Sequence, residues 1–112
     1  MKDNRVYLRH IRDAIIRIES YVSRGRPAFL AETIIQDAVI RNLEVIGEAT
    51  KNLSDDLRAQ HPDVPWNRIA GMRDVLIHEY FGVRLETVWG VVENRLPELK
   101  RFVDIVLADD PS

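Results

Sequence analysis

Residues 66–83 read WNRIAGMRDVLIHEYFGV, and the apolar residues of this stretch recur at the spacing of an α-helix. At ~100° per residue, Trp66, Ile69, Arg73, Leu76 and Tyr80 fall on one stripe of that helix. Arg73 interrupts an otherwise apolar seam, where an unpaired charge is costly. The pattern therefore predicts that Arg73 pairs inside the protein, or that the seam opens into a cleft or a subunit interface.

The same helix carries side chains that suit RNA cleavage without a metal ion. Arginine binds phosphate through two parallel hydrogen bonds, and histidine takes and gives protons near neutral pH. We therefore interpret Arg73 as a phosphate ligand and His78 as a general base or acid. Asp74 lies four residues before His78 on the same helix face, where it would hold the imidazole in one tautomer.

The spacing between the two central residues raises a geometric problem. His78 lies five residues after Arg73, roughly 140° around a straight helix, so the two side chains would point apart. One site then requires the helix to end or bend, or a second subunit to complete it, and we expect a homodimer. Structural roles stay open: Arg73 paired with Glu44 or Glu48, and His78 packed at a helix end.

Helical periodicity continues along the chain and predicts an all-α fold, a small bundle of about five helices with long central helices. The expected helices cover about residues 2–23, 28–53, 54–60, 65–82 and 85–107. The first has an apolar stripe of Leu8, Ile11, Ile15, Ile18 and Val22. Ser54 is expected to cap the third, and His61 to be exposed in the loop that follows it. Pro97 lies inside the last of them and is expected to kink or split it. The length of 112 residues indicates a single domain over residues 1–112.

Composition excludes several classes of site. The chain has no cysteine, which rules out disulfides, zinc–thiolate sites and thiol nucleophiles. No apolar run approaches the ~20 residues of a membrane span, so we expect a soluble, cytoplasmic protein. The net charge is −2, although Lys2, Arg5, Arg9 and Arg12 form a basic helix face. That face is either a phosphate contact or an ordinary solvated surface.

Two segments together resemble a known family. Residues 66–83, and a second block that reads RNLEVIGEA over residues 41–49, closely resemble the HepT toxins, a branch of the HEPN ribonuclease superfamily. Arg73, Asp74 and His78 match the superfamily signature, and Tyr80 completes the HepT pattern Arg-x4-His-x-Tyr. The resemblance implies a HEPN-like fold and a metal-independent endoribonuclease that needs no cofactor and acts as a toxin.

The resemblance also implies a partner and a modification. The partner would be a minimal nucleotidyltransferase (MNT) antitoxin that transfers AMP to Tyr80, and HEPN dimers agree with the expected homodimer. Two other functions stay open. One is a non-catalytic nucleotide- or RNA-binding helical module that keeps Arg73 as a phosphate clamp; the other is a structural partner of a nucleotidyltransferase. Tyr80 would then simply pack at the helix end.

Overall fold

The computed structural model describes the backbone of residues 3–78 and 84–109, and the side chains of residues 3–72 and 84–108. Every regular element in these ranges is helical, which confirms the expected all-α, HEPN-like fold. The elements are α1 (Asn4–Tyr21), α2 (Arg26–Ala31), α3 (Thr33–Lys51), α4 (Asp55–Gln60), α5 (Trp66–His78), α6 (Leu85–Gly90), the π-helical turn η2 (Val91–Arg95) and α7 (Leu96–Asp109).

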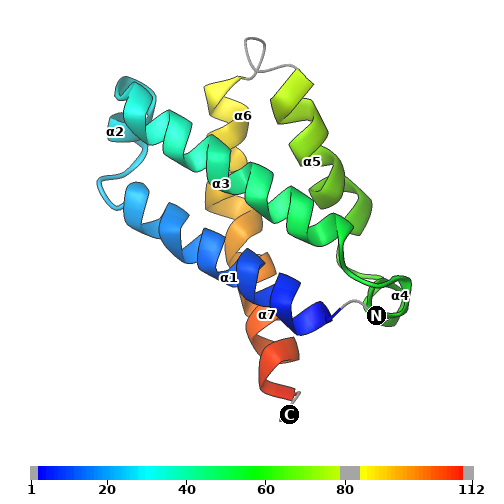
Figure 1. Cartoon of the computed structure of the whole chain (residues 1–112). Helices are drawn as coiled ribbons and strands as arrows, with labels where there is room; N and C mark the ends of the chain where they lie inside the picture. Colours follow the sequence, from blue (N-terminus) through cyan, green and yellow to red (C-terminus); the bar gives the residue numbers. More distant parts are fainter. Residues whose placement is uncertain (1–2, 79–83, 110–112) are drawn as a thin grey trace.

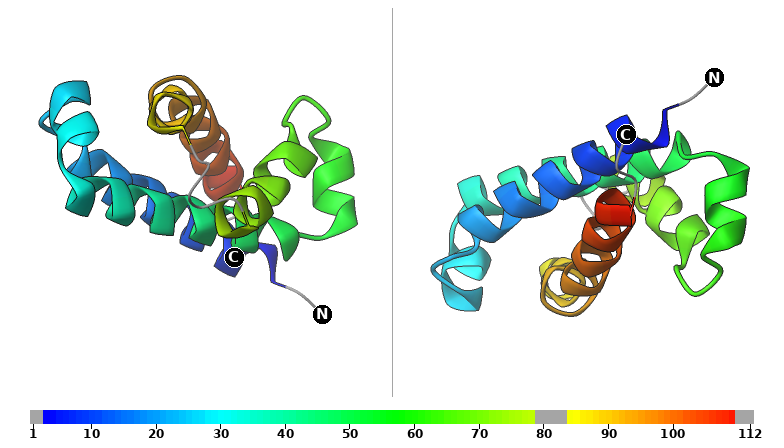
Figure 2. Two further views of the ribbon diagram at one scale, coloured as in Figure 1. Left: turned by 90° about the horizontal axis from the view of Figure 1, so that it is seen from above. Right: turned by 90° about the horizontal axis from the view of Figure 1, so that it is seen from below.

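Helix α3 lies at the centre of the bundle. It packs against α1 on one side and against α5 on the other, and α5 runs back along it in roughly the opposite direction (Figure 1). The elements α6, η2 and α7 form one rod that crosses behind the α1–α3 pair (Figure 2). The buried stripe of α1 matches the predicted one, with Leu8, Ile11, Ile15 and Ile18 at most 1% exposed.

The prediction of one long helix over residues 28–53 is wrong, because the helix is divided at Glu32 into α2 and α3. This residue has an extended backbone, with φ −116° and ψ 112°, between α2 and α3. The side-chain amide of Gln36 donates hydrogen bonds to the carbonyls of Phe29 and Leu30, which the end of α2 leaves without helical partners. The break turns Phe29 into the core, where it is fully buried beside Trp89.

The irregularity predicted near Pro97 lies just before the proline. The amide of Leu96 donates to the carbonyl of Val91, five residues back, and α7 then continues through Pro97 without a break. Proline removes one amide donor and crowds the carbonyl four residues earlier, and a widened turn relieves both effects. The helix therefore passes Pro97 by local π-helical winding.

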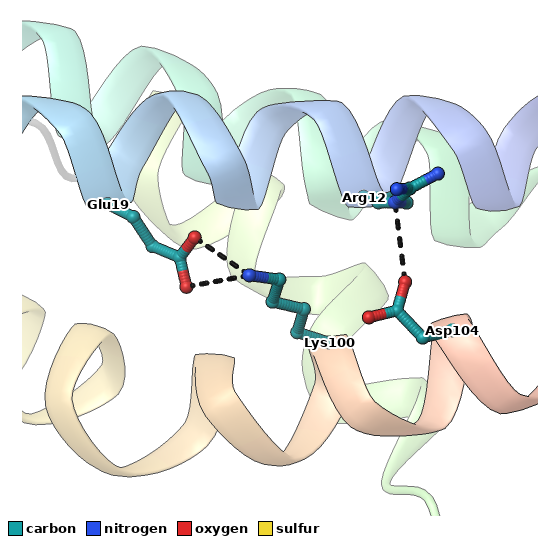
Figure 3. Close-up of polar contacts among 4 residues, drawn as sticks. All are labelled: Arg12, Glu19, Lys100 and Asp104. Carbon is teal, nitrogen blue, oxygen red and sulfur yellow. Dashed lines mark hydrogen bonds and ion pairs between the residues drawn. The ribbon is translucent and has the colours of Figure 1, made fainter.

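Charged residues hold α1 and α7 in register (Figure 3). Arg12 pairs with Asp104 at 3.3 Å, and Lys100 donates to the carboxylate of Glu19 at 3.0 Å. All four side chains are roughly one-third to one-half exposed, so each pair contributes little stability and mainly favours one alignment of the helices. One member of the predicted basic face, Arg12, thus serves a contact within the protein.

The predicted cap of the short third helix is confirmed. The hydroxyl of Ser54 accepts a hydrogen bond from the amide of Leu57 at the start of α4. Asn4, the first residue of α1, donates to the same hydroxyl and accepts from the Ser54 amide. This reciprocal contact ties the beginning of α1 to the turn that leads toward α5.

The central position of α3 predicts a strong dependence on its buried residues. Leu43→Ala should lower the free energy of unfolding by about 2–5 kcal/mol, since Leu43 is 1% exposed and its truncation leaves a cavity. Ile34→Ala on the same helix is the control and should change it by less than about 0.5 kcal/mol, because Ile34 is 77% exposed. Urea unfolding measures both; equal losses would contradict the assigned core.

Candidate active site

The beginning of α5 is fixed by Trp66. Its indole N–H donates to the carbonyls of Arg58 and His61, at 3.2 and 3.0 Å, and its ring packs edge-on against Phe102 of α7 at 5.3 Å. His61, predicted to be an exposed loop residue, instead places its ring 4.8 Å from Phe102 and is half-buried. The helix that carries the motif is thus anchored to its preceding loop and to α7.

The motif positions follow from the buried face of α5. Trp66 and Ala70 are 6% and 9% exposed, and they mark the stripe of the helix that is covered. Arg73 comes three residues after Ala70 and seven after Trp66, so its helix position continues this stripe. The backbone thus continues the stripe to Arg73, and whether the Arg73 side chain is covered stays a prediction.

The remaining motif residues are placed only in part. Asp74 and His78 lie on one regular α-helix at i and i+4, which puts their backbone positions on one face. The side chains of Arg73, Asp74 and His78 lie outside the described residues, and so does the whole of Tyr80. Their mutual contacts, and the alternative pairing of Arg73 with Glu44 or Glu48, therefore stay predictions.

The regularity of α5 narrows the geometric alternatives. The helix is α-helical from Trp66 to His78, so it does not break between Arg73 and His78. Their positions are then separated by roughly 140° around the axis. A single site must use the end of the helix at His78 or a residue from a second subunit.

A pocket of about 290 Å³ lies between α5 and the rod that ends in α7. Its wall is mostly apolar and includes Ile69, Met72 and Leu99, with Arg68 and Arg95 among its charged members. Sequence reasoning did not select these two arginines. They are 27 residues apart in the chain, and the fold brings them to one pocket between α5 and the rod.

Among the described residues, no three His, Asp or Glu side chains gather in a way that could hold a metal ion. Within the same part of the chain, no helix combines the length and apolar character that crossing a membrane requires.

Comparisons with known proteins agree with the motif and the fold. The family model "Ribonuclease HepT-like" matches residues 11–106. A relative from Caldanaerobacter subterraneus subsp. tengcongensis, whose name assigns it to the RNases, is 43% identical over 108 residues and is covered over 96% of both chains.

A longer relative and a solved structure are also similar to this chain. A Methanocaldococcus jannaschii protein named as a gamma-glutamylcyclotransferase and RNase is 45% identical over 103 residues, 91% of this chain but only 46% of its own length. The solved tri-AMPylated HEPN toxin of Shewanella oneidensis, in complex with MNT antitoxin, superposes with a TM-score of 0.72 over 96% of this chain and 99% of its own. At 23% identity, this likeness shows a shared fold.

The anchoring of α5 gives a testable prediction. Trp66→Phe keeps an aromatic ring but loses both indole hydrogen bonds, and it should destabilise the protein by about 1 kcal/mol more than Trp89→Phe. The control is matched because the buried indole N–H of Trp89 has no hydrogen-bond partner among the described residues. Thermal and urea unfolding measure the difference. Equal destabilisation by the two substitutions would show that the indole bonds do not fix α5.

Proposed function

Because the chain belongs to the HepT-like ribonuclease family, we propose that it is a metal-independent endoribonuclease that acts as the toxin of a toxin–antitoxin pair. The observation that carries the proposal is the spacing Arg73-x4-His78-x-Tyr80 at the end of an anchored helix. Arg73 supplies a permanent cation for the scissile phosphate, and His78 supplies a group that titrates near neutral pH.

The proposed reaction uses the RNA as its own nucleophile. The 2′-oxygen attacks the adjacent phosphorus, and the bond from phosphorus to the 5′-oxygen of the next nucleotide breaks. His78 accepts the proton of the 2′-hydroxyl or donates one to the leaving 5′-oxygen. Arg73 stabilises the negative charge that builds on the phosphoryl oxygens, and Asp74 orients the imidazole. The products are a 2′,3′-cyclic phosphate and a 5′-hydroxyl.

The proposal includes a homodimer. Arg73 and His78 occupy positions roughly 140° apart on a regular helix, so one protomer does not bring both to the same phosphate unless the helix ends at His78. A second copy packed against α5 would supply the missing residue. The two motifs would then line one cleft.

The proposed partner is an MNT-type nucleotidyltransferase antitoxin. The solved HEPN toxin that shares this fold is tri-AMPylated and is held in complex with MNT antitoxin. We carry this over to Tyr80, which is seven residues after Arg73 and therefore shares its helix stripe if α5 continues. AMP on Tyr80 would add negative charge and bulk beside Arg73 and exclude RNA phosphate.

Catalysis is tested by substitution of the two central residues. Arg73→Ala and His78→Ala should each lower the rate of RNA cleavage at least about 100-fold, the usual contribution of a transition-state cation or a general base. A chelator should leave the wild-type rate unchanged. The assay measures cleavage of bulk RNA and identifies the new 3′ ends chemically.

Arg68→Ala is the matched control, since Arg68 lies on the same helix five residues before Arg73, roughly 140° around the axis. It should retain most of the activity, and each variant should sediment as the wild-type dimer does. RNA binding with no cleavage by the wild type would favour the non-catalytic binding module. Neither binding nor cleavage would favour a structural partner of a nucleotidyltransferase.

Modification is tested at Tyr80. Tyr80→Phe keeps the ring and removes the hydroxyl that would accept AMP, so the variant should cleave RNA but escape inactivation by the cognate nucleotidyltransferase and ATP. Intact-mass spectrometry before and after incubation measures the added AMP. AMP found on Tyr80→Phe, or none on the wild type, would overturn the assignment.

A further inference from the structure

A second concave surface lies on α1 and α3 and uses the block RNLEVIGEA that the proposed mechanism leaves without a role. Its volume is about 350 Å³, within the range of roughly 300–1,000 Å³ that small-ligand sites have. We call it the α1–α3 groove. The polar and aromatic residues that line it are Tyr7, His10, Arg41, Glu44, Glu48 and Asn52.

The charges of this groove suit a base better than a phosphate. Glu44 and Glu48 both line it, and two carboxylates repel a phosphodiester. A carboxylate accepts hydrogen bonds through two oxygens and donates none. Guanine offers two N–H groups side by side, at N1 and at the 2-amino group, and these match the two oxygens of one carboxylate.

Glu44 is the better placed of the two carboxylates. Its side chain is 19% exposed, so a bond formed there is largely shielded from water. Its present partner is Arg41, whose guanidinium lies 3.6 Å away and whose side chain is 73% exposed. Because the Arg41 side chain is mostly exposed and its contact with Glu44 is long, the pair contributes little, and Arg41 can exchange the carboxylate for a flanking phosphate of the RNA backbone at small cost.

The other wall of the groove is aromatic. The rings of Tyr7 and His10 lie 6.0 Å apart at 86°, so a planar base that stacks on one ring meets the edge of the other. Unpaired RNA bases are commonly held in this way, stacked on tyrosine or histidine and hydrogen-bonded along one edge. Asn52 is held in place by the bond from its amide to the carbonyl of Glu48, at 2.9 Å.

The groove and the motif helix α5 share a neighbour, helix α3. Helix α3 supplies Arg41 and Glu44 to the groove, and the same helix packs against α5. Packed helix axes are roughly 8–10 Å apart, so an RNA strand that crosses α5 can also reach α3.

We propose that the α1–α3 groove binds an unpaired guanine of the RNA close to the cleaved phosphate and sets the sequence preference of cleavage. The carboxylate of Glu44 accepts from guanine N1–H and the 2-amino group, the Tyr7–His10 pair stacks on the base, and Arg41 binds a neighbouring phosphate. The inference rests on the proposed ribonuclease activity, and its two tests separate the groove from that activity.

The first test reads the cleavage preference. Fragment ends from wild-type digests should show guanine at one fixed offset from the cut. Inosine at that position lacks the 2-amino group and should lower kcat/KM roughly 10-fold, the effect of one hydrogen bond to a charged group. Glu44→Gln should lower cleavage of the guanine substrate by a similar factor and abolish the difference between guanine and inosine.

Two variants serve as comparisons in this test. Glu93→Gln makes the same charge change on η2 and should leave the preference intact. Arg41→Ala should weaken cleavage of all sequences alike. It should also lower the slope of log RNA affinity against log salt concentration by about 1, the loss of one phosphate contact. A uniform loss of rate in Glu44→Gln, with the guanine preference unchanged, would overturn the proposal. Glu44 would then act as the ion-pair partner of Arg73.

The second test needs no cleavage. Titration of 5′-GMP into the intact protein, followed by NMR, should shift the backbone amides of His10, Glu44 and Asn52, and 5′-IMP should bind roughly 10-fold more weakly. GMP binding here by a protein that does not cut RNA would support the groove and refute the ribonuclease. RNA cleavage without guanine preference, or GMP shifts confined to other surfaces, would refute the groove.

Discussion

The need to cover α3 on two sides determines the arrangement of the bundle. Val39, Leu43 and Ile46 are at most 1% exposed, and the buried positions of this helix extend around about half of its circumference. One neighbour cannot bury so wide a surface, so α1 and α5 flank it and the α6–α7 rod closes the back. The motif helix therefore owes its position to the apolar surface of α3, and the chemistry of α5 is placed by hydrophobic packing.

Sequence patterns predicted those features that depend on neighbours within one or two turns. The apolar stripe of α1 and the Ser54 cap both follow from local spacing. The break at Glu32 was missed because helical periodicity continues on both sides of it. Contacts between different helices favour the break. Phe29 is buried beside Trp89, and the side chain of Gln36 donates a hydrogen bond to a carbonyl at the end of α2.

The functional surfaces likewise divide into those set by local spacing and those set by contacts between helices. The residues Arg73, Asp74 and His78 are close in sequence, so their spacing alone suggested a site. Tyr7 and Arg41 meet at one groove only because α1 packs on α3, and Arg68 and Arg95 share a pocket only because α5 packs near η2. No periodicity within a single helix reports such pairs. The π-helical turn before Pro97 is similar, since proline indicates an irregularity but not the form that relieves it.

Because α1 packs against α7, the start of α1 and the end of α7 lie on the same side of the bundle. The first turn of α1 and the last turn of α7 lie toward the lower end in Figure 1, whereas α5 ends toward the upper end. A domain fused to either end would thus emerge away from the end of α5. The bundle can therefore be joined to another domain at either end. In agreement with this, it matches less than half of a longer Methanocaldococcus jannaschii protein.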